Sequence, residues 1–207
     1  MNERLSTFVR ELYADGVGHD AVQPDRLLKR RNLEPATAEL LGLIVRIAGA
    51  QRVVEIGTAN GFSTLWLADA VCDTNGQIVS VDTMSDKEAR SNLARADVAQ
   101  PGLARRVQLR QHDGGDYLAQ LPDGVVDLLF LDAERVEYPE WWPHPVRVLR
   151  PGGVLAIDNV LSHANEVAPF LKLVSQEEEF VGVTIAVGKG LHVAWRRDGP
   201  QHAQRAA

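Results

Sequence analysis

Cysteine is almost absent from this 207-residue sequence, which contains only Cys72. A single thiol excludes an intramolecular disulfide and a metal site built from several thiolates. Long apolar runs are also missing, because no stretch reaches the ~18 residues needed to span a bilayer. The first twelve residues are charged and amphipathic, without the apolar core of a signal peptide. We therefore expect a cytoplasmic protein with no membrane partner.

Positive charge is in the minority, with 22 Lys and Arg against 28 Asp and Glu and a formal net charge of -6. This balance argues against nucleic acid or anionic lipid as the main partner. The one basic run, residues 29–31, is predicted to be a solvated segment. The length suits one domain with a full core, and no repeat or linker interrupts it. We expect a single domain over residues 1–207.

Short β-branched runs alternate with amphipathic stretches along the middle of the chain. The predicted strands cover residues 52–56, 77–82, 106–111, 125–132 and 153–158. The predicted helices between them cover residues 64–71, 86–99, 116–120 and 138–149. The helix at 86–99 begins with the spacing of a capping box, from Ser85 to Glu88. Such alternation predicts an α/β fold with a Rossmann-like, doubly wound parallel sheet.

Both ends of the chain depart from this alternation. Residues 1–50 are predicted to form helices and no strands, including an apolar helix at 36–48 that leads into the first strand. After a helix at 166–175, strands at 180–187 and 191–195 are separated by only three residues and must form an antiparallel hairpin. The sheet should therefore have seven strands, one of them reversed. The polar residues 198–207 are expected to be a disordered tail.

Ligands of open α/β sheets bind beyond the carboxyl ends of the strands. After the first predicted strand, a loop from Gly57 to Ser63 leads into a helix whose free N–H groups can face a ligand. The second strand ends in Asp82, which can accept hydrogen bonds from both hydroxyls of a ribose. The third is followed by Asp113 and Gly114, in a turn short enough to lie against a flat base. Together these features favour a ligand that contains a nucleoside.

The glycine loop distinguishes between nucleoside ligands. Its spacing from Gly57 to Gly61 is G-x-x-x-G rather than the dinucleotide pattern G-x-G-x-x-G, and the loop has no basic side chain. It suits a methionine tail better than a pyrophosphate, and Glu55 can face the ammonium group of that tail. A nicotinamide-dependent oxidoreductase remains the alternative.

Side chains with oxygen donors follow the fourth and fifth predicted strands. Asp132 ends one strand, and Asp158 and Asn159 end the other. Neighbouring strands would bring all three to one point, where a hard divalent cation prefers such ligands. The alternative is that Asp158 and Asn159 only cap the turn that follows.

The runs VVEIGTANGFSTLWLA, SVD, LLFLDAERVEY and LRPGGVLAIDNVL give this sequence a family resemblance. From about residue 36 to residue 195 it resembles the class I, metal-dependent O-methyltransferases of the catechol and caffeoyl-CoA type, which use S-adenosylmethionine. The resemblance implies that Glu55, Gly57 and Ser63 hold the methionine portion, Asp82 the ribose, and Asp113 and Gly114 the adenine, with Asp132 also beside the cofactor. It implies that Asp132, Asp158 and Asn159 bind magnesium. It also implies a homodimer and a small hydroxylated acceptor, catechol-like or a vicinal diol.

One position departs from the family pattern. The family loop after the fourth strand reads D-x-x-K with a lysine base, whereas this chain has Arg135. A guanidinium does not accept a proton at neutral pH, so Arg135 is predicted to stabilise a phenolate or to orient an anionic acceptor. His163 is the candidate base near in sequence, although it can equally be an exposed loop residue. The departure leaves open a non-catalytic protein that only binds S-adenosylmethionine.

Overall fold

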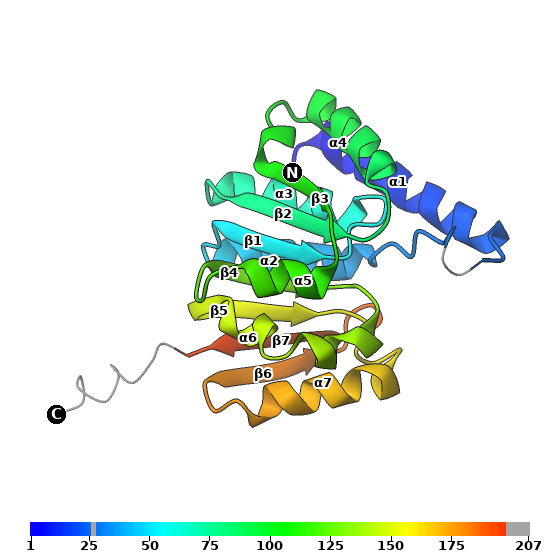
Figure 1. Ribbon diagram of the computed structural model, residues 1–207. Coiled ribbons are helices and arrows are strands. Elements are labelled where there is room, and N and C mark those ends of the chain that lie inside the picture. Colours follow the sequence, from blue (N-terminus) through cyan, green and yellow to red (C-terminus); the bar gives the residue numbers. More distant parts are fainter. Residues whose placement is uncertain (26–27, 198–207) are drawn as a thin grey trace.

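A seven-stranded sheet forms the centre of the computed structural model, which describes residues 1–25 and 28–197 (Figure 1). The strands are β1 (Arg52–Ile56), β2 (Gln77–Asp82), β3 (Val107–Gln111), β4 (Val126–Leu131), β5 (Leu149–Ile157), β6 (Phe180–Ile185) and β7 (Leu191–Arg196). Their order in the sheet is β3-β2-β1-β4-β5-β7-β6. Strands β1 to β5 pair in parallel, and β7 is antiparallel to both β5 and β6. The predicted fold, mostly parallel with one reversed strand, is confirmed.

The strands are apolar almost throughout because both faces of the sheet are covered. In β4, Leu128 and Phe130 pack into the core cluster that contains the side chains of α1, α2 and α3. The alternate residues Leu129 and Leu131 pack into the second cluster, with side chains of α5 and α7. Side chains of a strand alternate between faces, so a run without polar positions requires two cores.

Helices lie on both sides of this sheet, and Figure 1 shows α5, α6 and α7 on the near side. Their bounds are α1 (Glu3–Val22), α2 (Pro35–Ile47), α3 (Phe62–Asp73), α4 (Lys87–Ala99), α5 (Gly114–Gln120), α6 (His144–Arg147) and α7 (Ala164–Gln176), with the 3-10 turns η2 (Ala104–Arg106) and η3 (Arg135–Trp141). No helix among residues 1–25 and 28–197 is long and apolar enough to cross a membrane. The predicted tail at 198–207 lies outside the described residues.

Two local predictions are wrong. The helix expected at 138–149 is replaced by η3, a break and the four-residue α6, and Leu149 already belongs to β5. Three prolines in this segment lack a backbone N–H and fix φ, so a continuous helix cannot form. The capping box is also replaced, because Asp86 is the N-cap of α4 and Glu88 pairs with Arg30 at 2.8 Å.

Backbone hydrogen bonds hold the carboxyl ends of the central strands together at one edge of the sheet. The N–H of Asp132, just after β4, donates to the carbonyl of Ile56 in β1 at 2.9 Å. The N–H of Asp158, just after β5, donates to the carbonyl of Leu131 in β4 at 3.1 Å. The polar residues that follow these strands are therefore neighbours.

Candidate functional site

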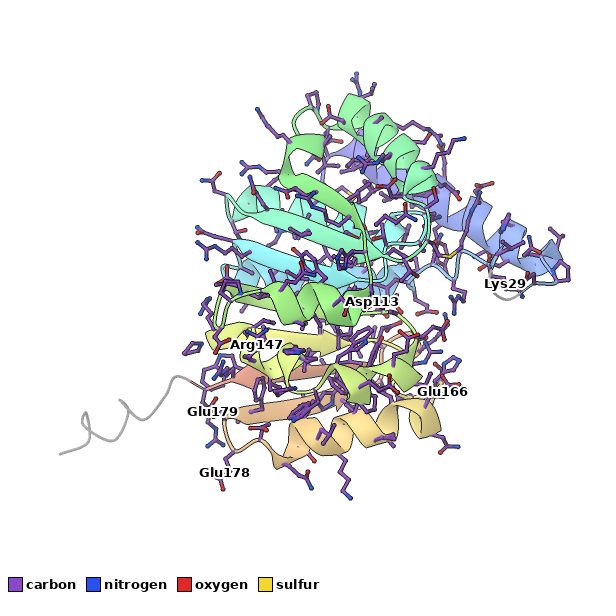
Figure 2. The ribbon with its side chains drawn as sticks, in the orientation of Figure 1. Lys29, Asp113, Arg147, Glu166, Glu178 and Glu179 are labelled. Atoms are coloured by element: carbon purple, nitrogen blue, oxygen red, sulfur yellow. The ribbon has the colours of Figure 1, made fainter. Side chains whose placement is uncertain are left out.

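A cavity of about 300 Å³ opens at this edge of the sheet, and its size is within the range of small-molecule sites. Its wall combines the connection before α2, the loop after β1, the segments after β2 to β5, and the β6–β7 turn. Residues that line it include Lys29, Arg31, Gly57, Ser63, Asp82, Asp113, Gly114, Asp132, Arg135, Trp141, Asn159, His163 and Lys189. In Figure 2, Lys29, Asp113 and Glu166 lie towards this edge, whereas Arg147, Glu178 and Glu179 lie towards the opposite one.

Gly57 allows the ends of β1 and β4 to approach closely. Its φ is +111°, and a Cβ atom there would lie 2.2 Å from the carbonyl oxygen of Asp132. Only glycine combines this backbone conformation with such an approach. The glycine therefore fixes where Asp132 stands in the cavity.

Asp82 holds the glycine loop in place. Its Oδ2 accepts the N–H groups of Thr58 and Ala59, both at 2.9 Å, and its Oδ1 accepts the N–H of Met84 at 2.8 Å. Each carboxylate oxygen has two acceptor sites, so Oδ2 is filled by its two N–H groups and Oδ1 keeps one site for a ligand hydroxyl.

Glu55 is fully buried in a group of hydroxyls next to the cavity. Its Oε2 accepts from Thr64 Oγ1 and Ser80 Oγ, both at 2.5 Å. Burial raises the pKa of Glu55 to about 7, and hydrogen bonds from Ser63, Ser80 and Thr64 oppose the shift. Its Oε1 is buried without a hydrogen-bond partner among the described residues. Glu55, predicted to face the methionine ammonium, is thus buried behind the cavity wall, and the residues that line the cavity include Ser63 but not Glu55.

Asp113 and Gly114 begin α5 at the far end of the cavity. Asp113 is the N-cap, with its Oδ1 accepting the N–H of Asp116 at 2.9 Å. A Cβ atom on Gly114 would lie 2.5 Å from Ile56 and 3.2 Å from the Trp141 ring. Because Gly114 has no side chain, Trp141 can form a flat wall of the cavity.

Two of the three candidate metal ligands, Asp132 and Asn159, are in direct contact. Asn159 Nδ2 donates to Asp132 Oδ1 at 2.9 Å, and Asn159 has the left-handed φ of +65°. Asp158 is 2% exposed, and its Oδ1 accepts from no group in the described part of the chain. Burial raises the pKa of Asp158 to about 7. Burial, and then the charge of Asp158, raise the pKa of Asp132.

These shifts reveal two buried carboxyl groups without enough positive charge beside them. A divalent cation with oxygen ligands would supply that charge, and the donor set of two carboxylates and one amide fits it. No group of three His, Cys, Asp or Glu side chains in residues 1–25 and 28–197 is arranged to hold a metal. In the predicted ligand set the third ligand would be the amide oxygen of Asn159, whose Nδ2 donates to Asp132 in this structure.

Arg135 and His163 both line the cavity. Arg135 is 4% exposed, and its Nε donates to Glu166 Oε2 at 2.9 Å. The Nδ1 atom of His163 lies 2.9 Å from Ser162 Oγ. The catalytic roles of Arg135 and His163 remain predictions. Both residues line the cavity, as those roles require.

Two sets of basic residues were not assigned to the site from the sequence. Lys189 enters the cavity from the β6–β7 turn, where the sequence indicated only a hairpin. Residues 29–31 also line the cavity, and they stay accessible to solvent as predicted, with Arg31 exposed. Arg30 pairs with Asp15 at 2.6 Å, and Arg31 pairs with Glu134 at 3.0 Å. Because the acidic partners of Arg30 and Arg31 lie far from them in the sequence, no local sequence pattern indicated these ion pairs.

The model of the O-methyltransferase family matches residues 19–189. The chain belongs to this family. A catechol O-methyltransferase from Niastella koreensis is 28% identical over 175 residues, which are 78% of this chain and 76% of that protein. The family assignment leaves the oxidoreductase alternative without support.

Solved structures agree with this assignment. The O-methyltransferase from Bacillus cereus in complex with SAH has a TM-score of 0.76 and 25% identity, covering 92% of this chain and 91% of that one. The O-methyltransferase TomG from Streptomyces achromogenes, involved in tomaymycin synthesis and in complex with SAM, has a TM-score of 0.72 and 25% identity. The match covers 95% of this chain and 91% of that one.

Proposed function

We propose that this O-methyltransferase transfers the methyl group of S-adenosylmethionine to a hydroxyl of a small catechol-like or vicinal-diol molecule, assisted by a divalent cation, most simply Mg²⁺. The observation that carries the proposal is the buried Asp158 next to Asp132 and Asn159, which line the same cavity as the glycine loop. The relative named catechol O-methyltransferase and the structures with SAH and SAM support it.

The cavity has the chemistry that the cofactor requires. Bound S-adenosylmethionine supplies an electrophilic methyl group on a sulfonium. Asp82 would accept from the ribose hydroxyls while it holds the loop, and Asp113 and Gly114 would border the adenine. Ser63, backed by the buried Glu55, would hold the methionine end. Asp82 and Asp113 bring negative charge to this part of the wall, which suits a cationic ligand.

Asp132, Asp158 and Asn159 would hold the divalent cation, which lowers the pKa of a bound hydroxyl. Arg135 stays protonated, and its bond to Glu166 fixes it where it can stabilise negative charge on the acceptor. His163 has the chemistry to take the proton near neutral pH. Trp141 offers a flat wall beside Gly114, where the adenine would lie. The main contribution of these residues is to hold the acceptor oxygen in line for attack.

The test is a methyl-transfer assay with a panel of catechols, flavonoids and aliphatic diols, before and after chelation and after addition of Mg²⁺. We expect methylated hydroxyl products that disappear on chelation and return with the metal. Asp158→Asn should lose most activity, while Asp123→Asn, an exposed carboxylate on the opposite side of the sheet, should not. No product with any acceptor would contradict the transferase and favour a protein that only binds the cofactor. Full activity after chelation would contradict the need for a divalent cation, but not the methyl transfer itself.

We also propose a homodimer. The side chains of Val181, Val183 and Trp195 lie on one face of the β6–β7 hairpin, because Val181 is paired with Trp195 and Val183 is two residues further on. These residues are 48%, 59% and 41% exposed. An apolar face of this kind on an edge hairpin supports contact with a second copy of the chain.

A further inference from the structure

The β6–β7 turn is fixed directly onto the chain that follows Asn159. The carbonyl oxygen of Lys189 accepts the N–H groups of Leu161 and Ser162, both at 3.0 Å. The carbonyl oxygen of Gly190 accepts the N–H of Val160 at 3.1 Å. Lys189 therefore has a defined position beside the proposed metal ligands, and it lines the same cavity as Asp132 and Asn159.

The ammonium of Lys189 is paired with one carboxylate and feels the charge of two others. Its Nζ lies 2.9 Å from Oε1 of Glu34, which is the N-cap of α2. Burial lowers the pKa of Lys189, but the hydrogen bond to Glu34 and the charges of Glu34, Asp158 and Asp132 more than offset this, so its pKa is raised. The charge of Lys189 in turn lowers the pKa of both Asp132 and Asp158, against the effect of their burial. The half-buried lysine is thus a permanent positive charge next to the pair.

The other cation that acts on this pair is held elsewhere. Arg135 also lowers the pKa of Asp132 and Asp158, but its Nε is bound to Glu166. Among the described residues, the ammonium of Lys189 is bound to Glu34 Oε1, and the Oε2 atom of Glu34 is buried with no hydrogen-bond partner there. The lysine side chain is long and has free rotamers, so it can share the pair with another cation or withdraw from it.

We propose that Lys189 is a built-in counter-cation of Asp132 and Asp158, which competes with the divalent cation for this pair and keeps that ion weakly bound and exchangeable. The competition rests on the metal site proposed above, whereas the counter-cation role does not require a metal. A second positive charge near a 2+ ion repels it through a medium of low dielectric constant, so the lysine must weaken metal binding.

The counter-cation role is tested on metal-free protein with thermal unfolding of the native chain, Lys189→Met, Asp158→Asn and the double variant. Loss of the ammonium leaves the carboxylates uncompensated, so Lys189→Met should lower the unfolding midpoint more in the native background than in the Asp158→Asn background. Equal decreases in both backgrounds would overturn the proposal. Binding of S-adenosylhomocysteine by each variant checks that it is folded.

The competition is tested by Mn²⁺ binding, followed by electron paramagnetic resonance of the metal. Lys189→Met should bind Mn²⁺ about tenfold or more tightly than the native chain, and Lys189→Arg, which keeps the charge, within about threefold of it. Lys172→Met, an exposed change of equal charge on α7, should leave Mn²⁺ affinity unchanged. Equal Mn²⁺ affinity in Lys189→Met and the native chain would overturn the proposal. If no variant binds Mn²⁺, the proposed metal site fails, and the unfolding cycle alone decides the role of Lys189.

Discussion

Single residues of this site carry two tasks at once. Asp82 binds three backbone N–H groups of its surroundings and is also the expected ribose ligand. Arg135 is expected to act on the acceptor, yet Glu166 already holds it. Substitutions at such residues combine a local structural effect with a functional one, so each needs a readout that separates the two.

Asp82→Ala should weaken binding of S-adenosylmethionine by roughly 2–4 kcal/mol, because charge-assisted hydrogen bonds to the ribose are lost and the glycine loop is released. Isothermal titration calorimetry measures the change. Asp123→Ala, which alters an exposed carboxylate, is the control. Unchanged affinity in the Asp82 variant would mean that this residue does not bind the ribose.

The pH dependence of the rate should reveal which group removes the proton from the acceptor hydroxyl. If His163 accepts the proton, His163→Ala should reduce turnover by roughly 10²-fold, without a comparable effect on cofactor affinity. The native rate should rise through the titration range of imidazole, since Arg135 stays protonated. An unchanged rate in the His163 variant would assign deprotonation to the metal-bound hydroxyl alone.

Gly57→Ala should destabilise the fold by roughly 1–3 kcal/mol or more, because the backbone is left-handed and the new Cβ meets the carbonyl of Asp132. Chemical denaturation gives the free energy of unfolding. Gly18→Ala in α1 is a matched control, since no described atom lies within 4 Å of its Cβ position. It should stabilise the helix slightly. Equal effects of the two substitutions would show that the close approach at Gly57 is unimportant.

At the scale of the elements, the strands could be predicted because their signal is local. The β-branched and apolar runs gave β1 and β2 with the observed bounds. The helix expected at 138–149 does not form, because three prolines interrupt the segment despite its apolar residues. The meeting of Asp132 with Asn159 followed from the parallel topology. The position of Lys189 could not be predicted from that topology, because it depends on hydrogen bonds between the hairpin turn and residues 160–162.

The β6–β7 hairpin should carry the dimer contact. Val183→Lys places a charge in the centre of its exposed apolar face and should convert the protein to a monomer in analytical ultracentrifugation. Val98→Lys on α4, at an even more exposed valine, should leave the dimer intact. A native chain that sediments as a monomer would contradict the homodimer, and a dimeric Val183→Lys variant would place the contact elsewhere.

At the scale of the whole molecule, buried acidic groups link stability to pH. The folded-state pKa of Glu55 is raised to about 7 from the ordinary 4.5, so the folded chain binds a proton more readily than the unfolded one. The free energy of unfolding should therefore fall as the pH rises from about 4.5 to about 7, with Glu55 contributing about 3 kcal/mol. The buried pair Asp132 and Asp158 adds to the same trend.

Glu55→Gln should remove its part of this slope, whereas Glu178→Gln, on the exposed surface, should not. Denaturant unfolding at pH 5 and pH 8 measures the difference. The same pH dependence in Glu55→Gln and the native chain would show that Glu55 is ionised in the folded protein at both pH values.

The order of strands in the sheet differs from the order in which the ribosome makes them. The last strand to emerge, β7, lies between β5 and β6. A growing chain already contains the residues of the cofactor side, from Glu55 to Gly114, when the acceptor side still lacks Asp158 and Lys189. Until β7 emerges, β5 is an edge strand and β6 has no neighbour, which exposes backbone groups to aggregation. Translation that stops between residues 185 and 191 would leave an enzyme with its methyl-donor side formed and its acceptor side open.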